Sequence, residues 1–309
     1  MNTRNLVSVV LGAYNGERYL KEQIDSILEQ TYRDIELIIT DDCSTDDTAG
    51  ILKDYAGRYE NVHVYFNEEN LGLIRNYEKA LKYPKGAYIA FADQDDIWLP
   101  HKIQSLLDNI GDSMLIYSDC AYIDADGRLM GKKLSDYRNL ISGRNLYMLD
   151  SGSGIWIAAH AMMFRRELLD PALPFSPYFS HDTWLAYIAM LKGNVTFLPE
   201  VLVLYRQHGA NTVGGLGCHK MMKNARPARA ERYMMQQLEA GRIDALLSRA
   251  AEADAEFRDF LNRMKTCAAH PVFYNRVRRM LLRFKYVNRI YAPRKRNVVR
   301  RLFKAIKSF

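Results

Sequence analysis

Through the first 110 residues, short apolar runs alternate with segments whose apolar residues recur at helical spacing. A short apolar run bounded by polar residues is typical of a buried strand, whereas apolar residues three and four positions apart are typical of an amphipathic helix. The expected strands cover residues 6–11, 35–40, 62–66 and 88–92, and the expected helices cover residues 17–30, 45–59, 73–81 and 100–110. This alternation predicts the α/β class, with a mostly parallel sheet and helices on both faces.

The second half of the chain continues the alternation and then becomes helical. We expect a helix over residues 182–191, a strand over 201–205, and a helical region over 218–270, where Met and Leu are interleaved with Arg and Glu. A chain of 309 residues is long enough for one large α/β domain and an appendage. The predicted division is an α/β domain over residues 1–217 and a helical C-terminal region over residues 218–309.

Carboxylates gather where the predicted strands end. Asp41 and Asp42 follow the second strand, and Asp93, Asp95 and Asp96 follow the fourth. Because the carboxyl ends of parallel strands open to the edge where ligands bind, these side chains should share one rim. Five like charges there are costly to hold ionised unless a cation offsets them. Oxygen ligands favour Mg²⁺ or Mn²⁺, with a nucleoside diphosphate as the natural third party. Capping of the following helix is the alternative for Asp96.

Several other classes lack their sequence signatures. The four cysteines form no C-x-x-C pair, which disfavours a zinc site or a disulfide framework. Neither G-x-G-x-x-G after the first strand nor G-x-x-x-x-G-K-[ST] occurs, which disfavours dinucleotide and P-loop folds. No run approaches the length of a membrane span, and no export signal precedes the first strand, so we expect a cytoplasmic protein.

A series of short motifs is the most specific signal in the chain. They are Val9-Val-Leu-Gly-Ala-Tyr-Asn15, Thr40-Asp-Asp-Cys-Ser-Thr-Asp46, Asn70-Leu-Gly72 with Arg75-Asn76, Phe91-Ala-Asp-Gln-Asp-Asp-Ile-Trp98, His181-Asp-Thr-Trp184 and Tyr205-Arg-Gln-His-Gly-Ala-Asn211. With these motifs, residues 5–215 resemble glycosyltransferase family 2, which has the Rossmann-like GT-A type of fold. The resemblance is greatest to bacterial members that add rhamnose or similar sugars to surface polysaccharides. Each motif is weak alone, but their order and spacing are specific.

The resemblance implies a nucleotide-sugar site. Its implied members are Ala13, Tyr14, Asn15, Glu17, Asp42, Asn70, Arg75, Asp93, Gln94, Trp98 and Arg206. Asp42 is expected to accept the N3–H of the donor's pyrimidine ring, which uracil and thymine offer and cytosine lacks. Asp93 would contact the ribose, and Arg206 would contact a phosphate. Core packing remains the alternative for Tyr14, and a solvated helix face the alternative for Arg75.

The resemblance also implies a metal site and a general base. Asp95 and His208 are the implied ligands of a Mn²⁺ or Mg²⁺ ion that bridges the donor phosphates. Asp182 would take the proton from an acceptor hydroxyl that attacks the anomeric carbon from the opposite face, so one displacement inverts the configuration. A helix cap is the alternative for Asp182, and a structural imidazole is the alternative for His208.

These implications describe an inverting, metal-dependent glycosyltransferase that uses a dTDP- or UDP-sugar and a saccharide acceptor in surface polysaccharide synthesis. Rhamnose is the sugar that the resemblance suggests, but galactose, glucose or an N-acetylhexosamine would use the same base pocket. A non-catalytic scaffold is disfavoured because Asp42, Asp93, Asp95 and Asp182 are all retained. A sugar nucleotidyltransferase is disfavoured because residues 12–17 lack a Gly-rich, Arg-containing loop.

The chain departs from the family pattern ahead of the expected acceptor site. Relatives often carry a Gly-Cys or Gly-Ala pair there, where this chain has Ala158-Ala-His-Ala161. The motifs therefore leave the acceptor undefined. Thr40 and Cys43 also replace the more usual Val and Gly beside the Asp pair, but the carboxylates stay in place and donor binding is expected to survive.

Charge divides the chain unevenly. Residues 260–309 hold 15 Lys and Arg and no Asp or Glu, whereas the preceding residues carry a net charge of −8. From about residue 271 the apolar positions keep a helical stripe opposite Arg and Lys, a pattern typical of a helix on an anionic membrane surface. We therefore expect a peripheral protein on the cytoplasmic face of the membrane, acting on a lipid-linked acceptor. A helix packed on the domain is the alternative, and no nucleic-acid-binding motif is found.

Overall fold

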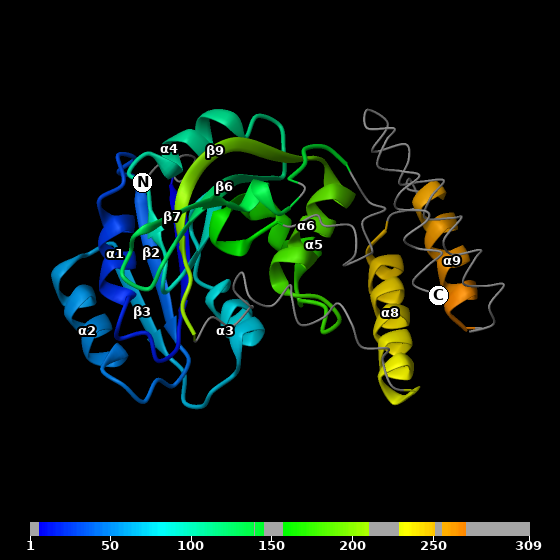
Figure 1. The fold of residues 1–309 in the computed structure, drawn as a ribbon, viewed down its shortest axis with the longest axis horizontal. Helices are drawn as coiled ribbons and strands as arrows, with labels where there is room; N and C mark the ends of the chain where they lie inside the picture. The colour runs from blue at the N-terminus through cyan, green and yellow to red at the C-terminus, as the bar shows by residue number, and fades with distance from the viewer. Residues whose placement is uncertain (1–5, 139, 145–156, 210–228, 251–254, 270–309) are drawn as a thin grey trace. The chain divides into compact units, whose positions relative to one another are not determined.

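The computed structural model of the chain describes residues 6–138, 140–144, 157–209, 229–250 and 255–269 (Figure 1). The chain divides into two compact units, one of residues 1–144 and 154–225 and the other of residues 145–153 and 226–309. The predicted boundary at residue 217 and the basic tail from residue 271 lie outside the described residues. Among the described helices, none is long and apolar enough to span a membrane.

The first unit is built on one twisted sheet. Its strands are β1 (Val7–Ala13), β2 (Ile35–Asp41), β3 (Val62–Phe66), β4 (Tyr88–Asp93), β5 (Ile97–Trp98), β6 (Leu115–Ile123), β7 (Leu129–Lys133), β8 (Met162–Arg165) and β9 (Val195–Arg206). Their order is β3-β2-β1-β4-β8-β6-β9-β5, with β7 paired to β6. Strands β3, β2, β1 and β4 are parallel, so their carboxyl ends share one rim as the sequence predicts. The fold class is confirmed.

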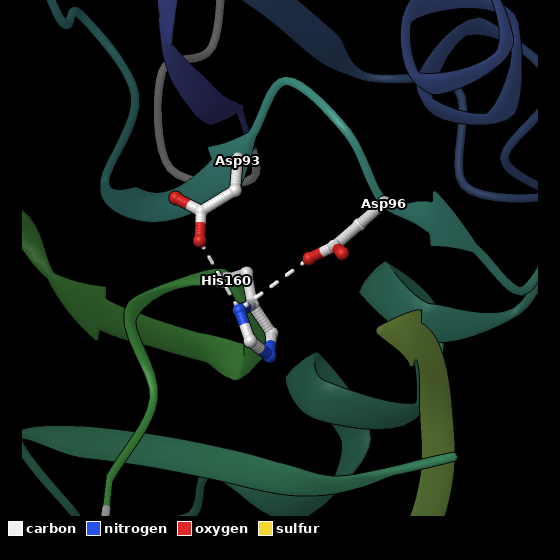
Figure 2. Close-up of side chains that lie close together, drawn as sticks. All are labelled: Asp93, Asp96 and His160. Atoms are coloured by element: carbon white, nitrogen blue, oxygen red, sulfur yellow. Dashed lines mark hydrogen bonds and ion pairs between the residues drawn. The ribbon is translucent and has the colours of Figure 1, made fainter. Parts of the chain in front are cut away.

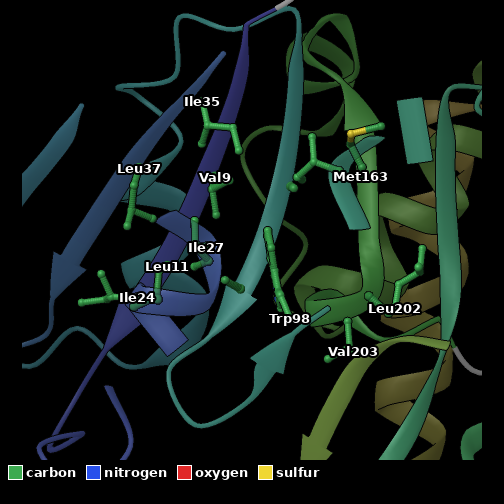
Figure 3. Close-up of a cluster of buried hydrophobic side chains, with 14 of the residues drawn as sticks. Val9, Leu11, Ile24, Ile27, Ile35, Leu37, Trp98, Met163, Leu202 and Val203 are labelled. Atoms are coloured by element: carbon green, nitrogen blue, oxygen red, sulfur yellow. The ribbon is translucent and has the colours of Figure 1, made fainter. Parts of the chain in front are cut away.

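Helices cover both faces of this sheet. They are α1 (Leu20–Leu28), α2 (Thr48–Arg58), α3 (Leu73–Ala80), α4 (Lys102–Asn109), α5 (Leu169–Ala172) and α6 (His181–Lys192). One face packs Ile24 and Ile27 of α1 against Val9 and Leu11 of β1 (Figure 3). Truncating such a fully buried side chain to Ala costs roughly 2–5 kcal/mol.

The opposite face of the sheet belongs to α3 and the start of α6. The ring of Tyr77 on α3 lies with its centroid 4.9 Å from that of Phe91 on β4, and His181 stacks on Tyr77 at 4.6 Å. Because side chains alternate along a strand, Phe91 faces these helices while its neighbours Ala90 and Ala92 face the α1 layer. The helix layers therefore bring the start of α6 to the fourth strand.

The second half of the sheet was less predictable than the first. The expected strand over residues 201–205 is the end of the longer strand β9 (Val195–Arg206), and β8 runs antiparallel between β4 and β6. Strand β8 has only four residues, and its apolar run continues from the buried residues 157–161. An apolar run of this kind predicts that the strand is buried but not whether it is parallel or antiparallel, because its direction depends on the strands with which it pairs.

The second unit contains α8 (Arg229–Arg249) and α9 (Ala255–Ala269), which confirms helices over these parts of residues 218–270. Ile243 and Leu246 of α8 are buried, as are Phe260 and Leu261 of α9. The Nζ of Lys265 lies 2.6 Å from Oδ1 of Asp244. Both partners are about half exposed, so this ion pair contributes little to stability.

Candidate functional site

Asp95 and His208 meet at the rim. Strand β5 pairs antiparallel with β9, so the loop after β4 lies beside the end of β9. As a result His208 Nε2 lies 2.7 Å from Asp95 Oδ2, with side chains only 12% and 16% exposed. Burial raises the pKa of Asp95, the nearby charge of Asp93 adds to the rise, and the hydrogen bond from His208 opposes it. A cation at these two ligand atoms would offset that cost.

Arg206 forms hydrogen bonds with the loop that carries Asp95. Its guanidinium is 1% exposed; Nε donates to the Asp95 carbonyl at 2.8 Å, Nη1 to the Ala125 carbonyl at 3.2 Å and Nη2 to Glu22 Oε2 at 2.5 Å. Its backbone N–H donates to Asp96 Oδ1 at 3.0 Å. In this arrangement the Arg206 guanidinium holds the loop that carries Asp95. The role of Arg206 as a phosphate ligand stays a prediction.

A second cluster lies deeper, under the same loop. His160 Nδ1 lies 3.2 Å from Asp93 Oδ2 and 3.4 Å from Asp96 Oδ2 (Figure 2). The ligand atoms of these residues lie within 4.8 Å of one another, a spacing that could hold a metal ion. Lys102 Nζ donates to the His160 carbonyl at 2.5 Å and lies 3.3 Å from the ring centroid of the buried Trp98.

The pKa shifts in this cluster reflect burial opposed by charge pairing. Burial alone would raise the pKa of Asp93, but the hydrogen bond and charge of His160 lower it. Burial would lower the pKa of His160, but the charge of Asp96 and the bond to Asp93 hold it well above its usual value. Burial raises the pKa of Asp96 to about 8. The opposite charges of His160 and of the two carboxylates thus favour one another against the cost of burial.

Sequence reasoning did not select His160 as a site residue. The turn Ala159–Ala161 that carries it precedes β8, and β8 pairs antiparallel with β4. Antiparallel pairing places the start of β8 beside the end of β4, where Asp93 lies. The available signal was a histidine inside the uncharged run before β8, but only the pairing shows which carboxylates it meets.

Asp42 is held by the loop that precedes α3. Its Oδ1 accepts hydrogen bonds from Leu71 N and from Asn67 Nδ2, both at 2.8 Å, and its Oδ2 accepts one from Gly72 N at 2.8 Å. Asn70 Nδ2 donates to the Asp42 carbonyl at 3.2 Å. Because a carboxylate has about four acceptor positions and three are occupied, one position on Oδ2 is left, on a residue that is only 3% exposed.

The loop after β1 joins the other predicted members of the donor site. Tyr14 N donates to Gln94 Oε1 at 2.9 Å, and Gln94 Nε2 donates back to the Tyr14 carbonyl at 3.0 Å. Asn15, with a left-handed φ of 48°, accepts from Thr45 N through Oδ1 at 2.8 Å. Short polar side chains tolerate that backbone region because they bond locally. These bonds hold Tyr14 with 46% of its surface exposed at the rim.

Two further predicted residues tie this loop to its neighbours. The Ala13 carbonyl accepts from Asp42 N at 2.8 Å, and Glu17 Oε2 accepts from Asp47 N at 2.9 Å. The remaining two lie differently: Arg75 is exposed on α3, and Trp98 is only 2% exposed in the hydrophobic core. The structure thus gives Trp98 a packing role, and its contact with a donor stays a prediction.

Asp182 begins α6 next to His181, which packs beside the residues under the rim. His181 stacks on Tyr77, and the Tyr77 hydroxyl donates to Asp93 Oδ1 at 3.1 Å. Asp182 Oδ1 accepts from Thr183 N at 2.6 Å. The Ser180 side chain makes no capping bond to α6, and Asp182 lies in its first turn, where a carboxylate is stabilised by the helix dipole.

These features describe an α/β enzyme whose site lies at the carboxyl ends of the parallel strands. The chain belongs to glycosyltransferase family 2, because Glycosyl transferase family 2 matches residues 8–172, more than half of the chain. This is the family that the resemblance of its motifs implied.

Two bacterial relatives agree with this assignment. An uncharacterised glycosyltransferase of Nostoc sp. is 28% identical over 66% of this chain and 66% of its own length. A putative teichuronic acid biosynthesis glycosyltransferase of Bacillus subtilis is 38% identical over 39% of this chain and 48% of its own length. The matched region therefore spans about two thirds and about half of these two relatives.

Solved structures share the fold. Residues 1–349 of S. aureus TarS, in complex with UDP-GlcNAc, superpose with a TM-score of 0.58 at 18% identity over 92% of this chain and 81% of that 1–349 chain. The mannosyltransferase PcManGT of Pyrobaculum calidifontis, in complex with GDP-Man and Mn²⁺, gives a TM-score of 0.54 at 17% identity over 99% of this chain and 81% of its own. At this identity the likeness concerns the fold alone.

Proposed function

We propose that the protein transfers a sugar from a nucleoside-diphosphate sugar to a hydroxyl of a saccharide acceptor in surface polysaccharide synthesis, with a divalent cation at Asp95 and His208. The observation that carries the proposal is the 2.7 Å approach of His208 Nε2 to Asp95 Oδ2 at the open end of the parallel strands. When bound there, Mn²⁺ or Mg²⁺ would neutralise charge on the leaving diphosphate.

The donor set fits such a cation. One carboxylate oxygen and one imidazole nitrogen leave most of an octahedral shell for diphosphate oxygens and water, as Mn²⁺ and Mg²⁺ prefer. The mannosyltransferase of similar fold was solved with GDP-Man and Mn²⁺. Among the described residues, Asp93, Asp96 and His160 form the other candidate group. His160 and Asp96 are almost fully buried, so they leave little room for a diphosphate.

Asp42 and Tyr14 are the proposed contacts of the donor's nucleotide base. The free acceptor position on Asp42 Oδ2 suits the N3–H of uracil or thymine, and the exposed ring of Tyr14 offers a surface for stacking. We therefore propose a UDP- or dTDP-sugar as the donor. Rhamnose is the proposed sugar, with galactose, glucose and N-acetylhexosamine as the alternatives to be tested beside it.

Asp182 is the proposed general base. Its carboxylate would accept the proton of the acceptor hydroxyl as that oxygen forms the new bond to the anomeric carbon and the bond to the diphosphate breaks. The attack comes from the face opposite the leaving group, so the anomeric configuration inverts. Asp182 Oδ1 already accepts from Thr183 N, and this bond would orient Oδ2 for the acceptor.

The acceptor and the location are proposed from relatives and from charge. The Bacillus subtilis relative is named for teichuronic acid biosynthesis, which supports a surface polysaccharide as the product. The basic tail from residue 271 suits the anionic cytoplasmic face of the membrane and a lipid-linked acceptor. Sedimentation of the full chain with phosphatidylglycerol vesicles, but not with phosphatidylcholine vesicles, would support this location, and equal recovery with both would contradict it.

The proposed function is tested by donor binding and hydrolysis. Purified protein is titrated with dTDP-rhamnose and a panel of UDP-sugars in Mn²⁺ or in EDTA. We expect at least one donor to bind with Mn²⁺ and to lose at least tenfold in affinity in EDTA and in Asp95→Asn. Asp126→Asn is the matched control, because Asp126 is an exposed carboxylate paired with Arg128 at 3.0 Å. Binding of no nucleotide sugar would leave the scaffold alternative.

The role of Asp182 is tested on the same donors. Asp182→Asn should bind the donor within about threefold of the unmodified chain but lower the transfer rate by about 10²–10⁴, the range of a lost general base. Asp170→Asn, a change to an exposed carboxylate on α5, is the control. Unchanged transfer in Asp182→Asn would contradict the assignment of the base.

A further inference from the structure

His160 is a buried titratable residue that the proposed function does not use. Its side chain is 4% exposed, and it lies under the loop that carries Asp95 rather than at the open rim. A histidine in such a place is expensive to bury unless its ring is paired. The residues that pair with it therefore indicate what it does.

The His160 ring, on the turn before β8, contacts the loop that follows β4. Nδ1 lies 3.2 Å from Oδ2 of Asp93 and 3.4 Å from Oδ2 of Asp96 (Figure 2). The same ring nitrogen therefore contacts the two carboxylates that flank Asp95 in sequence. Asp96 Oδ2 has no hydrogen bond from other described residues, which leaves this ion pair as its contact in the cluster. Without the imidazole, carboxylate oxygens of Asp93 and Asp96 would lie within 4.8 Å of each other with no cationic group between them.

The His160 backbone is fixed as firmly as its ring. Lys102 Nζ donates to the His160 carbonyl at 2.5 Å, and the Lys102 side chain is itself fully buried against Trp98. The centroids of His160 and Tyr205 lie 4.5 Å apart, with Tyr205 on β9 just before Arg206. The ring thus contacts the loop after β4 and the end of β9, the two segments that supply Asp95 and His208.

Asp93 is the member of the cluster that reaches the rim. Its side chain is 35% exposed, whereas that of Asp96 is fully buried. Oδ1 of Asp93 lies 3.1 Å from the Tyr77 hydroxyl and shares its proton with the Ala92 carbonyl at 2.7 Å, while Oδ2 faces His160. A carboxylate bonded at both oxygens is held in one orientation, which is what a donor-binding group requires.

We infer that His160 is a positioning residue for the glycosyl-transfer site, whose imidazole holds Asp93 and Asp96 in place and leaves Asp95 with His208 to take the divalent cation. The inference rests on the proposed donor and cation binding at Asp95 and His208. It also assigns the cluster of Asp93, Asp96 and His160 to internal charge pairing instead of metal binding.

Nucleotide titration calorimetry on the full chain tests the inference, with UDP, dTDP and GDP as probes in Mn²⁺. His160→Gln removes the charge and moves the amide toward the place of Nε2, whereas His160→Asn keeps an amide donor near the place of Nδ1. We expect His160→Gln to weaken binding of the best probe about tenfold and His160→Asn to stay within about threefold. His101→Gln, a change to an exposed histidine beside Lys102, should bind like the unmodified chain.

A double-variant comparison separates positioning from packing. If His160 acts through Asp93, then Asp93→Asn with His160→Gln should bind no more weakly than Asp93→Asn alone. Additive losses, equal losses in His160→Asn and His160→Gln, or unchanged affinity in His160→Gln would each overturn the inference. If His160→Gln fails to fold by circular dichroism, His160→Asn is measured alone, and a loss of nucleotide affinity greater than about threefold in that variant overturns the inference.

Mn²⁺ binding without nucleotide, followed by electron paramagnetic resonance, distinguishes a ligand from a positioning residue. His160→Gln should keep Mn²⁺ affinity within about threefold, while Asp95→Asn should lose it. Equal loss in both variants would make His160 a metal ligand and overturn the inference. If the unmodified chain binds neither Mn²⁺ nor any probe nucleotide, both the proposed function and the inference are wrong. If it binds both, the results for the His160 variants test the inference alone.

Discussion

His208 Nε2 lies 2.7 Å from Asp95 Oδ2, although 113 residues separate the two in sequence. The antiparallel pairing of β5 with β9, in which Trp98 faces Val203, brings the two loops together. The ring of Tyr19 lies 4.9 Å from that of His208 and so covers the imidazole on one side. A short strand of two residues thus sets the geometry of the proposed cation site.

This pairing predicts strong coupling between the two ligands. Asp95→Asn and His208→Gln should each weaken Mn²⁺-dependent nucleotide binding by about 10–100-fold, and the double variant should be little weaker than the worse single variant. Titration calorimetry at several Mn²⁺ concentrations measures all three. Additive losses would mean that the two side chains act at separate places, and Asp126→Asn serves as the carboxylate control.

Gly72 is predicted to be irreplaceable for a backbone reason. Its φ of 78° and ψ of 159° lie in a region that is essentially reserved for glycine, and its N–H bonds Asp42. No atom lies within 4 Å of an added Cβ, so Gly72→Ala should cost about 1–3 kcal/mol through strain alone. Urea denaturation measures this cost, and nucleotide affinity should fall with it.

Gly57 provides the matched control for that change. It lies inside helix α2 with open space around its Cα, so Gly57→Ala should raise the free energy of unfolding by about 0.5–1 kcal/mol. If both alanine variants have the same effect on stability, the conformational explanation for Gly72 is wrong.

Arg206 is predicted to contribute more to folding stability than to nucleotide binding. Arg206→Met would remove the guanidinium hydrogen bonds to the part-buried carbonyls of Asp95 and Ala125, at a cost of about 1–3 kcal/mol for each group left unsatisfied. Arg206→Lys should recover only part of the loss, because an ammonium lacks the planar fork. Arg128→Met, at an exposed arginine, should change the urea midpoint little. A stable Arg206→Met that binds nucleotide poorly would instead favour the phosphate role.

Lys102 is predicted to make folding stability depend on alkaline pH. Burial holds its pKa well below the usual 10.5, so between the lowered pKa and about 10.5 the unfolded chain binds more protons than the folded chain. Stability should therefore rise with pH across this window, by at most about 1.4 kcal/mol per pH unit. Lys102→Met removes this dependence.

The measurement compares urea denaturation of the two chains at about pH 7 and about pH 9.5. The stability of the unmodified chain relative to Lys102→Met should increase between the two values. Lys82→Met, at an exposed lysine, should show no such trend. A relative stability that falls with pH would mean that the buried amine keeps its proton.

The sequence by itself determined the parallel half of the sheet and the rim of carboxylates. Residues 62–66 form β3 as predicted, and β1, β2 and β4 differ from their predicted ranges by one or two residues at an end. These elements were readable because a strand buried on both faces is apolar throughout and its helices carry a clear stripe. Three of the motifs that indicated the family lie at the ends of such strands, namely β1, β2 and β4.

Only the tertiary structure decided which of those residues act on one another. Asp95 and His208 could be chosen from motifs, but the contact between them depends on the β5–β9 pairing, and the contacts of His160 with Asp93 and Asp96 depend on β8 running antiparallel to β4. Strand order and direction follow from long-range packing of the whole sheet, which local periodicity does not record. The same holds for Trp98 and Arg206: the sequence shows an aromatic ring and a cation near the rim, and the packing places both inside.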